Sequence, residues 1–268
     1  MRLVSMAANV PGPVAVSRLV AGGASAVKIE APWGDQLAVI CPAWYAELHA
    51  GVRVERLDLK TPPGIAALKA LLRDSDVFLA SHRPSALERL GLDAGSLVRE
   101  FPALRHVNIV GDTMDPESPG HDLTYQARAG LLGHGAAALP LTLLADMMGA
   151  ERAHAAVLSV MHKPRGSSVV VGLYDALRDV AAPLYHGLTA VGGHLGGGNP
   201  AYGIYAAREG AIAVAALEPH FRARLYESLG LPDGADPSAV FATRTAIEWE
   251  AWAAERDLPL AAVRNSGS

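Results

Sequence analysis

The sequence has almost no cysteine and no long apolar run. Cys41 is the only cysteine among 268 residues, so no disulfide can form within the chain, which is typical of a protein in a reducing cytoplasm. A thiol without a neighbouring histidine is more often a packed side chain than a nucleophile. No stretch approaches ~18 uninterrupted apolar residues, and the N-terminal segment contains Pro11 and Pro13. We therefore expect neither a signal peptide nor a membrane-spanning helix.

The net charge of the sequence is also small. The formal net charge is −4, and the 23 Lys and Arg residues are scattered along the chain rather than gathered into a basic run. This pattern does not favour a nucleic-acid partner, although a local basic pocket could still bind a polyanionic small molecule. The sequence also has no His-x-x-x-His or cysteine pair with metal-ligand spacing, so we expect no metal site.

Short apolar runs alternate with helical patterns of about ten residues through the first two thirds of the chain. This alternation predicts a mostly parallel sheet with helices on both faces. The predicted strands are Ala26–Glu30, Leu57–Leu59, Val77–Ala80, His106–Val110 and Ser168–Gly172. The predicted helices are Pro13–Val20, Gly64–Leu72, Pro84–Leu90, Asp146–Met161 and Leu173–Val180.

The composition changes at a glycine-rich stretch from Gly187 to Pro200, which is typical of a flexible hinge or loop. Beyond it, Tyr202–Tyr205 and Ala211–Ala216 predict a hairpin, and the remainder has helical patterns. We therefore expect a large α/β domain over residues 1–190 and a smaller α+β domain over residues 191–268.

Several short motifs are weak evidence of a family when each is taken alone, but their shared order along the chain is informative. Together they resemble the family III CoA-transferases. The matching segments are Pro11-Gly-Pro13, Leu19–Glu30, Pro32-Trp-Gly-Asp35, Asp58-Leu-Lys60, Asp76–Pro84 and Leu87–Leu92. The resemblance implies an open, mostly parallel Rossmann-like domain, a second α+β domain after the glycine-rich hinge, and a coenzyme A thioester as the substrate. It also implies a homodimer.

Three further motifs resemble the α-methylacyl-CoA racemase branch of that family. Pro119–Tyr125 is similar to the stretch that supplies a catalytic histidine there, and Leu143-Leu-Ala-Asp146 is similar to the station of the catalytic aspartate. Ala213–Phe221 is similar to the hairpin that carries a carboxylate partner of the histidine. The resemblance therefore implies His121, Asp146 and Glu218 as catalytic residues.

The resemblance also implies which residues bind coenzyme A. Arg83 is the cation expected near the diphosphate or ribose. The other residues assigned to the ligand are Arg53, Arg56, Lys60, Asp122, Tyr125, Gly196, Gly197 and Gly198. Two departures from the family bear on this site: Gln36 stands where an arginine is usual, and the chain ends where the family's C-terminal segment would return to the large domain.

Three functions follow from these residues. In a racemase, His121 and Asp146 on opposite sides of the substrate α-carbon would exchange its proton, with Glu218 holding His121. In a CoA-transferase, Asp146 would instead attack the thioester carbonyl and form an acyl intermediate, a route that needs no histidine. A third possibility is a catalytically impaired CoA-binding subunit. The sequence identifies neither the acyl group nor an acceptor acid.

Each of these residues also has an ordinary structural interpretation. Asp146 could cap the helix that follows it, and His121 could be a turn residue. Glu218 could face solvent at the end of a strand, and the glycine run could be a linker.

Overall fold

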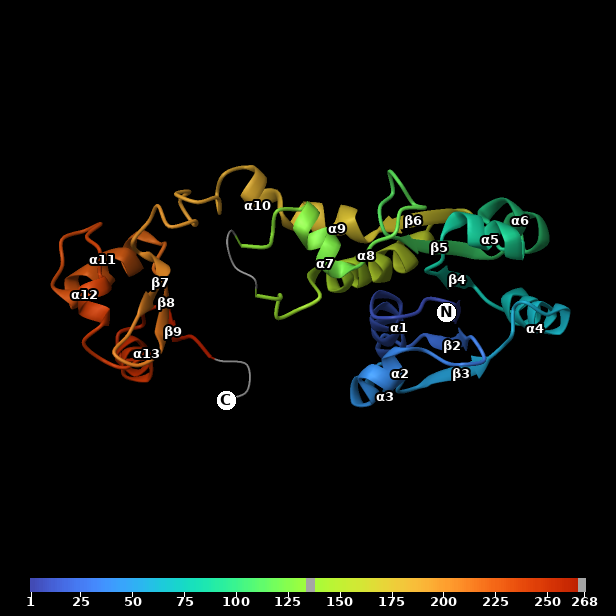
Figure 1. The fold of residues 1–268 in the computed structure, drawn as a ribbon, viewed down its shortest axis with the longest axis horizontal. Helices are drawn as coiled ribbons and strands as arrows, with labels where there is room; N and C mark the ends of the chain where they lie inside the picture. The colour runs from blue at the N-terminus through green and yellow to red at the C-terminus, as the bar shows by residue number, and fades with distance from the viewer. Residues whose placement is uncertain (134–137, 265–268) are drawn as a thin grey trace. The chain divides into compact units, whose positions relative to one another are not determined.

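The computed structural model describes residues 1–133 and 138–264, which form two compact units. Unit 1 is Met1–Ala181 and unit 2 is Ala182–Ser268, so the division lies a little before residue 190. Unit 1 contains a six-stranded sheet and unit 2 a three-stranded sheet (Figure 1). This architecture confirms the α/β fold with a second, smaller domain.

The sheet of unit 1 is parallel at every pair of neighbouring strands in the described residues. Its strand order is β3-β2-β1-β4-β5-β6, the order of a classic dinucleotide-binding fold. The strands are β1 (Arg2–Ser5), β2 (Ser25–Glu30), β3 (Val52–Arg56), β4 (Val77–Ala80), β5 (Arg105–Val110) and β6 (Ser168–Gly172). From β1 the chain adds β2 and β3 on one side, and it then adds β4, β5 and β6 on the other side. The direction in which strands are added therefore reverses between the neighbours β1 and β4.

Alternate side chains of the central strands face opposite layers of helices. Leu3 and Leu79 pack with α1 (Pro11–Ala21) and α8 (Leu144–Val160), whereas Val4 and Phe78 pack on the other face. That other face is covered by α4 (Pro62–Arg73), α5 (Pro84–Leu90) and α6 (Ala94–Glu100). Because both faces are covered, the central strands are apolar on both sides, as the sequence predicted.

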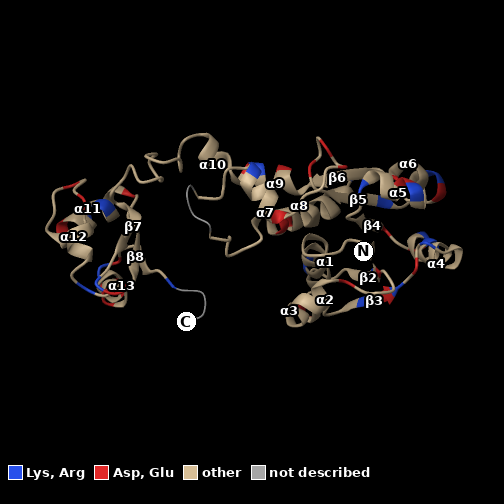
Figure 2. Cartoon of the chain, viewed as in Figure 1, with Lys and Arg blue, Asp and Glu red and all other residues tan. Residues whose placement is uncertain are grey.

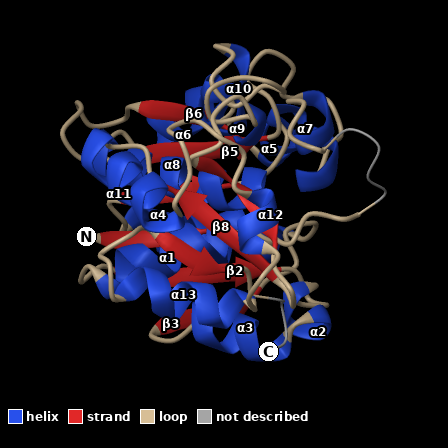
Figure 3. Cartoon of the chain, turned by 90° about the vertical axis from the view of Figure 1, so that its left-hand side faces the viewer, coloured by secondary structure: helices blue, strands red, loops and turns tan. Residues whose placement is uncertain are grey.

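The remaining elements of unit 1 connect or extend this core. They are α2 (Leu37–Ile40), α3 (Pro42–Leu48), α7 (Asp122–Arg128) and α9 (Leu173–Val180). In unit 2 the predicted hairpin is confirmed as β7 (Tyr202–Ala206) and β8 (Ala211–Ala215), and β9 (Leu260–Ala262) joins as a third antiparallel strand (Figure 1). The helices of unit 2 are α10 (Ala182–Tyr185), α11 (Pro219–Leu229), α12 (Ser238–Phe241) and α13 (Ala246–Ala254) (Figure 3).

One predicted strand is wrong. Leu57–Leu59 follows the outer strand β3 and is not part of it. β3 has the sequence Val-Arg-Val-Glu-Arg, and charged residues colour this outer strand of the sheet (Figure 2). Charged side chains are typical of a strand at the edge of a sheet. The apolar leucines were therefore a misleading signal, and the polar strand that precedes them was missed.

The glycine-rich segment of unit 2 has a more specific structure than a linker. The Leu195 N–H donates to Leu188 O at 2.9 Å, and the Gly198 N–H donates to Gly193 O at 2.9 Å. A Cβ atom at Gly193 would lie 2.2 Å from Gly187 O, and one at Gly196 would lie 1.9 Å from Ala190 O. Glycine is required there because backbone packs directly on backbone.

No helix within the described residues is long and apolar enough to cross a membrane. The four-residue segments Asn265–Ser268 and His134–Ala137 lie outside the description.

Candidate active site

The carboxyl ends of β1 and β4 meet at the point where the sheet reverses its direction of winding. In open parallel sheets, ligands bind in the crevice at this point. Ala8 and Asn9 follow β1, and Ser81 and His82 follow β4. The Ala8 N–H donates to Ser81 Oγ at 3.0 Å, so the two loops are tied together. Two cavities lie at this edge, and Ala8, Asn9 and His82 line both of them.

The first cavity has a volume of about 530 Å³ and is mainly apolar, with cations at its rim. Lys60 and Arg89 are exposed cations of its lining. Trp33 is 75% exposed and also lines the cavity, with Lys60 Nζ 5.9 Å from the centre of its ring. An exposed aromatic ring beside two cations offers contacts for both a planar base and phosphate groups.

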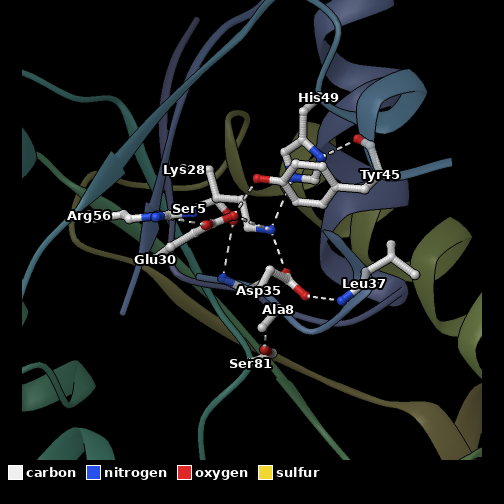
Figure 4. A network of polar contacts seen from close by, with 11 residues as sticks. Ser5, Ala8, Lys28, Glu30, Asp35, Leu37, Tyr45, His49, Arg56 and Ser81 are labelled. Atoms are coloured by element: carbon white, nitrogen blue, oxygen red, sulfur yellow. Dashed lines mark hydrogen bonds and ion pairs between the residues drawn. The ribbon is translucent and has the colours of Figure 1, made fainter. Parts of the chain in front are cut away.

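Lys28, Glu30 and Asp35 line the first cavity and belong to a network of polar contacts around Lys28 (Figure 4). Lys28 Nζ lies 2.5 Å from Asp35 Oδ2 and 3.2 Å from Glu30 Oε1, and all three side chains are at most 3% exposed. Asp35 also accepts a hydrogen bond from the Leu37 N–H at 2.9 Å. The network therefore fixes the loop between β2 and α2, which forms one wall of the cavity.

Two residues of α3 and its end complete this network. Tyr45 Oη donates to Glu30 Oε1 at 2.6 Å, and burial followed by the Glu30 carboxylate raises the pKa of Tyr45. His49 Nδ1 lies 2.6 Å from Tyr45 O, so this nitrogen carries the proton, and Nε2 accepts from Lys28 Nζ at 3.0 Å. Burial lowers the pKa of His49, in agreement with this neutral form.

The second cavity has a volume of about 290 Å³ and is lined by more polar side chains. His121, Asp146, Tyr125 and Arg83 all contribute to it. His121 occupies the N-cap position of α7 and is exposed, and its N–H donates to Thr124 Oγ1 at 3.0 Å. The two residues predicted as opposing bases therefore lie on the lining of one cavity.

Tyr125 is held in this cavity by two glycines. The ring is 3% exposed, and a Cβ atom at Gly111 would lie 2.1 Å from its hydroxyl oxygen. A Cβ atom at Gly120 would lie 2.5 Å from the same oxygen. The loop between β5 and α7 therefore needs glycine at both positions so that the ring can fit.

Asp146 lies in the first turn of α8 and is half-buried. Burial, followed by the negative charge of Asp122, raises the pKa of Asp146 to about 7. A carboxyl group with this pKa can exist in either protonation state near neutral pH, as a group that both takes and returns a proton requires.

Comparison with known proteins decides the family. The sequence profile of CoA-transferase family III matches residues 1–267. The chain belongs to CoA-transferase family III. It is 29% identical to the human α-methylacyl-CoA racemase over 92% of the chain and 72% of that protein. It is 30% identical to the cinnamoyl-CoA:phenyllactate CoA-transferase of Clostridium sporogenes over 50% of the chain and 36% of that protein.

Solved structures show the same fold. The crystal structure of Rv3272 from Mycobacterium tuberculosis superposes with a TM-score of 0.84 at 23% identity, covering 99% of this chain and 85% of the other. Because relatives of family III include both racemases and CoA-transferases, the chain is an enzyme of one of these two kinds.

Three of the residues predicted to bind coenzyme A are not among the residues that line the two cavities. Arg53 pairs with Glu55 at 3.2 Å, and Arg56 Nε lies 3.9 Å from Glu30 Oε2 on the outer strand. Asp122 is buried, and its carboxylate accepts hydrogen bonds from the start of α8. Lys60, Arg83 and Tyr125, by contrast, line the cavities.

The other predicted residues belong to unit 2. Glu218 is exposed and occupies the N-cap position of α11, which begins at Pro219. Gly196, Gly197 and Gly198 lie in the hydrogen-bonded glycine segment, where Gly197 has a φ of +99°. Their roles in the site stay predictions.

Sequence reasoning missed Asn9 and His82, which join the two cavities. Asn9 has a φ of +62°, an uncommon backbone conformation for a residue other than glycine and one that is enriched at functional sites. A signal was available, because both residues lie in the loops that follow the strands flanking the reversal of the sheet. It could not be used in full, because β4 was predicted and β1 was not.

Proposed function

We propose that the protein is a 2-methylacyl-CoA racemase that exchanges the α-proton of a CoA thioester between two bases. The observation that carries this proposal is that His121 and Asp146 line one cavity and that the pKa of Asp146 is about 7. The similarity to the human racemase extends over 92% of the chain, which further favours this reaction.

In the proposed reaction one base removes the proton from the carbon beside the thioester carbonyl. The electron pair of that C–H bond moves into the carbonyl group and gives an enolate. The opposite base then returns a proton to the other face of the carbon. His121 and Asp146 would exchange these roles according to the configuration of the substrate. Glu218, assigned by the resemblance, would hold the protonated His121.

The two adjoining cavities provide a path for the whole ligand. We place the nucleotide of coenzyme A in the first cavity, beside His82, with Lys60 and Arg89 available to its phosphates. The pantetheine arm would pass Asn9, and the thioester would lie in the second cavity with Arg83 near the junction. We also propose that the protein is a cytoplasmic homodimer; light scattering that gives a monomer at micromolar concentration would contradict the dimer.

A CoA-transferase is the second candidate, because several relatives are named as CoA-transferases. Asp146 would then attack the thioester carbonyl, release the CoA thiolate and form an acyl anhydride. The thiolate would then attack the Asp146 carbonyl of the anhydride, expel the donor acid as its carboxylate and leave an aspartyl-CoA thioester. Attack by an acceptor carboxylate would pass CoA to the acceptor and regenerate the Asp146 carboxylate. This route requires an ionised Asp146 and makes no use of His121.

Deuterium incorporation separates the two reactions. The parent protein is incubated with a 2-methylacyl-CoA in heavy water without an acceptor acid, and deuterium at the α-carbon is measured by mass spectrometry. We expect exchange in the parent and losses of about 10²–10⁴-fold in His121→Ala and Asp146→Asn. Glu218→Gln should weaken the exchange through His121.

The matched control is His162→Ala, an exposed histidine just beyond the other end of α8, which should retain full exchange. Full exchange in His121→Ala with each of the two epimers of the substrate would contradict the racemase. Transfer of CoA to a carboxylic acid, without exchange in its absence, would instead establish the transferase.

A further inference from the structure

Asp122, the residue that follows His121 in the sequence, makes an unusual set of contacts. Its side chain is buried, with the residue only 5% exposed. Asp122 Oδ1 accepts hydrogen bonds from the Ala145 N–H at 2.7 Å and the Asp146 N–H at 3.2 Å. These two amides belong to the first turn of α8, where backbone N–H groups have no partner within the helix.

The sequence at the start of α8 explains why this contact is needed. The N-cap residue is Leu143, which has no side-chain oxygen and makes no capping hydrogen bond. Asp122 therefore does from α7 what a serine or aspartate normally does from the N-cap position itself. Gln126, one turn further along α7, is 4% exposed and donates to Asp122 Oδ2 at 2.7 Å and to Thr142 O at 3.3 Å.

The contact has an electrostatic consequence for Asp146. The N-terminus of a helix normally favours a negative charge. Here the N–H groups of Ala145 and Asp146 already donate to Asp122. The Asp146 carboxyl group therefore lies near a second carboxylate and not near unpaired N–H donors. This arrangement agrees with the raised pKa of Asp146, of which burial is the first cause and Asp122 the second.

We propose that Asp122 is a positioning residue for Asp146, capping α8 from α7 so that the Asp146 carboxylate is held on the lining of the second cavity. The proposal rests on the proposed function in that Asp146 is the residue whose chemistry it serves. It assigns the Asp122 side chain to the protein scaffold rather than to coenzyme A. The like charge of Asp122 also keeps the proton affinity of Asp146 high.

The other charged groups near α8 either share the cavity lining with Asp146 or have partners of their own. His121, Tyr125 and Arg83 belong to the cavity lining. The side chains on the elements packed against α8 are paired as follows: Arg18 with Glu151, Arg152 with Asp179, Arg128 with Asp112, Asp175 with Thr113, Arg105 with Lys163 O, and His106 with Ser168. Arg178 lies near Asp112. Among the charged groups, Asp122 is the one that contributes to the raised pKa of Asp146.

Two substitutions separate the geometric part from the electrostatic part. Asp122→Asn keeps an oxygen that can accept from both amides but removes the charge. Asp122→Ala removes the cap as well. The titration of Asp146 is followed by NMR of ¹³C-labelled aspartate carboxyl groups, with Asp146→Asn to assign its signal. We expect the midpoint to fall by on the order of one pH unit in Asp122→Asn.

In Asp122→Ala we expect faster hydrogen exchange at the Ala145 and Asp146 amides and a decrease in kcat on the order of 10²-fold, with KM little changed. Asp122→Asn should recover most of that rate. The control is Asp93→Ala, which removes the cap of α6, where Asp93 accepts from the Ser96 N–H at 3.0 Å. That variant should change neither the Asp146 titration nor the α8 amides.

An unchanged Asp146 midpoint in Asp122→Asn would overturn the electrostatic part. Unchanged amide exchange and kcat in Asp122→Ala would overturn the capping part. If Asp122→Ala fails to fold, the Asn variant alone still tests the proposal. The NMR and hydrogen-exchange measurements need no activity, so an absence of α-proton exchange in the parent would count against the racemase and not against the role of Asp122.

Discussion

Unit 1 contains two buried groups of charges that differ in one respect. In the network around Lys28, the carboxylates of Glu30 and Asp35 surround one cation. At the start of α8, the Asp122 carboxylate accepts from the Asp146 N–H at 3.2 Å and raises the pKa of the Asp146 carboxyl group, and no cation within the described residues forms an ion pair with Asp146. The first group is arranged to hold a cavity wall. The second is arranged to keep one carboxyl group near its titration point, which is how charges are used in catalysis.

The strongest test of this comparison is to remove the cation from the paired group. Lys28→Met leaves Glu30 and Asp35 buried without an opposite charge, so the free energy of unfolding should fall by about 3–5 kcal/mol. Urea unfolding of the variant and the parent measures the loss. Lys60→Met, at an exposed lysine of the same cavity, is the control and should change stability by about 0.5 kcal/mol or less. A loss in Lys28→Met no larger than in the control would show that the network does not stabilise the wall.

Removal of a charge from the unpaired group, Asp122 and Asp146, should raise the free energy of unfolding and not lower it. The pKa of Asp146 is about 7 in the folded protein against an ordinary value of 3.8, so between these pH values the folded state holds a proton that the unfolded state has released. Stability should therefore fall as the pH rises through this window. Asp146→Asn removes that cost and should be more stable than the parent by about 1–3 kcal/mol at pH 8, in spite of its expected loss of activity.

Urea unfolding at pH 8 and below pH 4 provides the check for Asp146→Asn. The stability gain should disappear at the lower pH, because both states of the parent are then protonated. A gain of equal size at both values would mean that packing, and not the buried charge, causes it.

The two groups also differ in how far the sequence revealed them. The order of motifs placed His121 and Asp146 in one site, and both line the second cavity. The capping role of Asp122 could not be predicted, because it depends on α7 and α8 meeting in space and local patterns describe only neighbours in the chain. The Lys28 network was hidden for the same reason, since it joins β2 to α3.

The fold shows the same division between local and distant information. Strands with several apolar residues between turn signals, such as Val77–Ala80 and His106–Val110, were predicted almost to the residue. β1 was missed because only Leu3 and Val4 of its four residues are apolar, whereas all four residues of β4 are, and its central position comes only from pairing with β2 and β4. Once β1 was missed, the reversal of the sheet and its ligand crevice could not be located.

The smallest expected effect sharpens the comparison within the Lys28 network itself. Arg56 and Lys28 both approach Glu30, but the Arg56 side chain is 61% exposed and its Nε lies 3.9 Å from Glu30 Oε2, whereas Lys28 is 3% exposed. Water can solvate both the guanidinium group and the space it leaves. Arg56→Ala should therefore lower the free energy of unfolding by only about 0–1 kcal/mol, and the loss should shrink further at high salt. Urea unfolding at low and high salt measures both quantities. If Arg56→Ala lowered the free energy of unfolding as much as Lys28→Met, the burial of Lys28 would not explain why Lys28 stabilises the cavity wall more than Arg56 does.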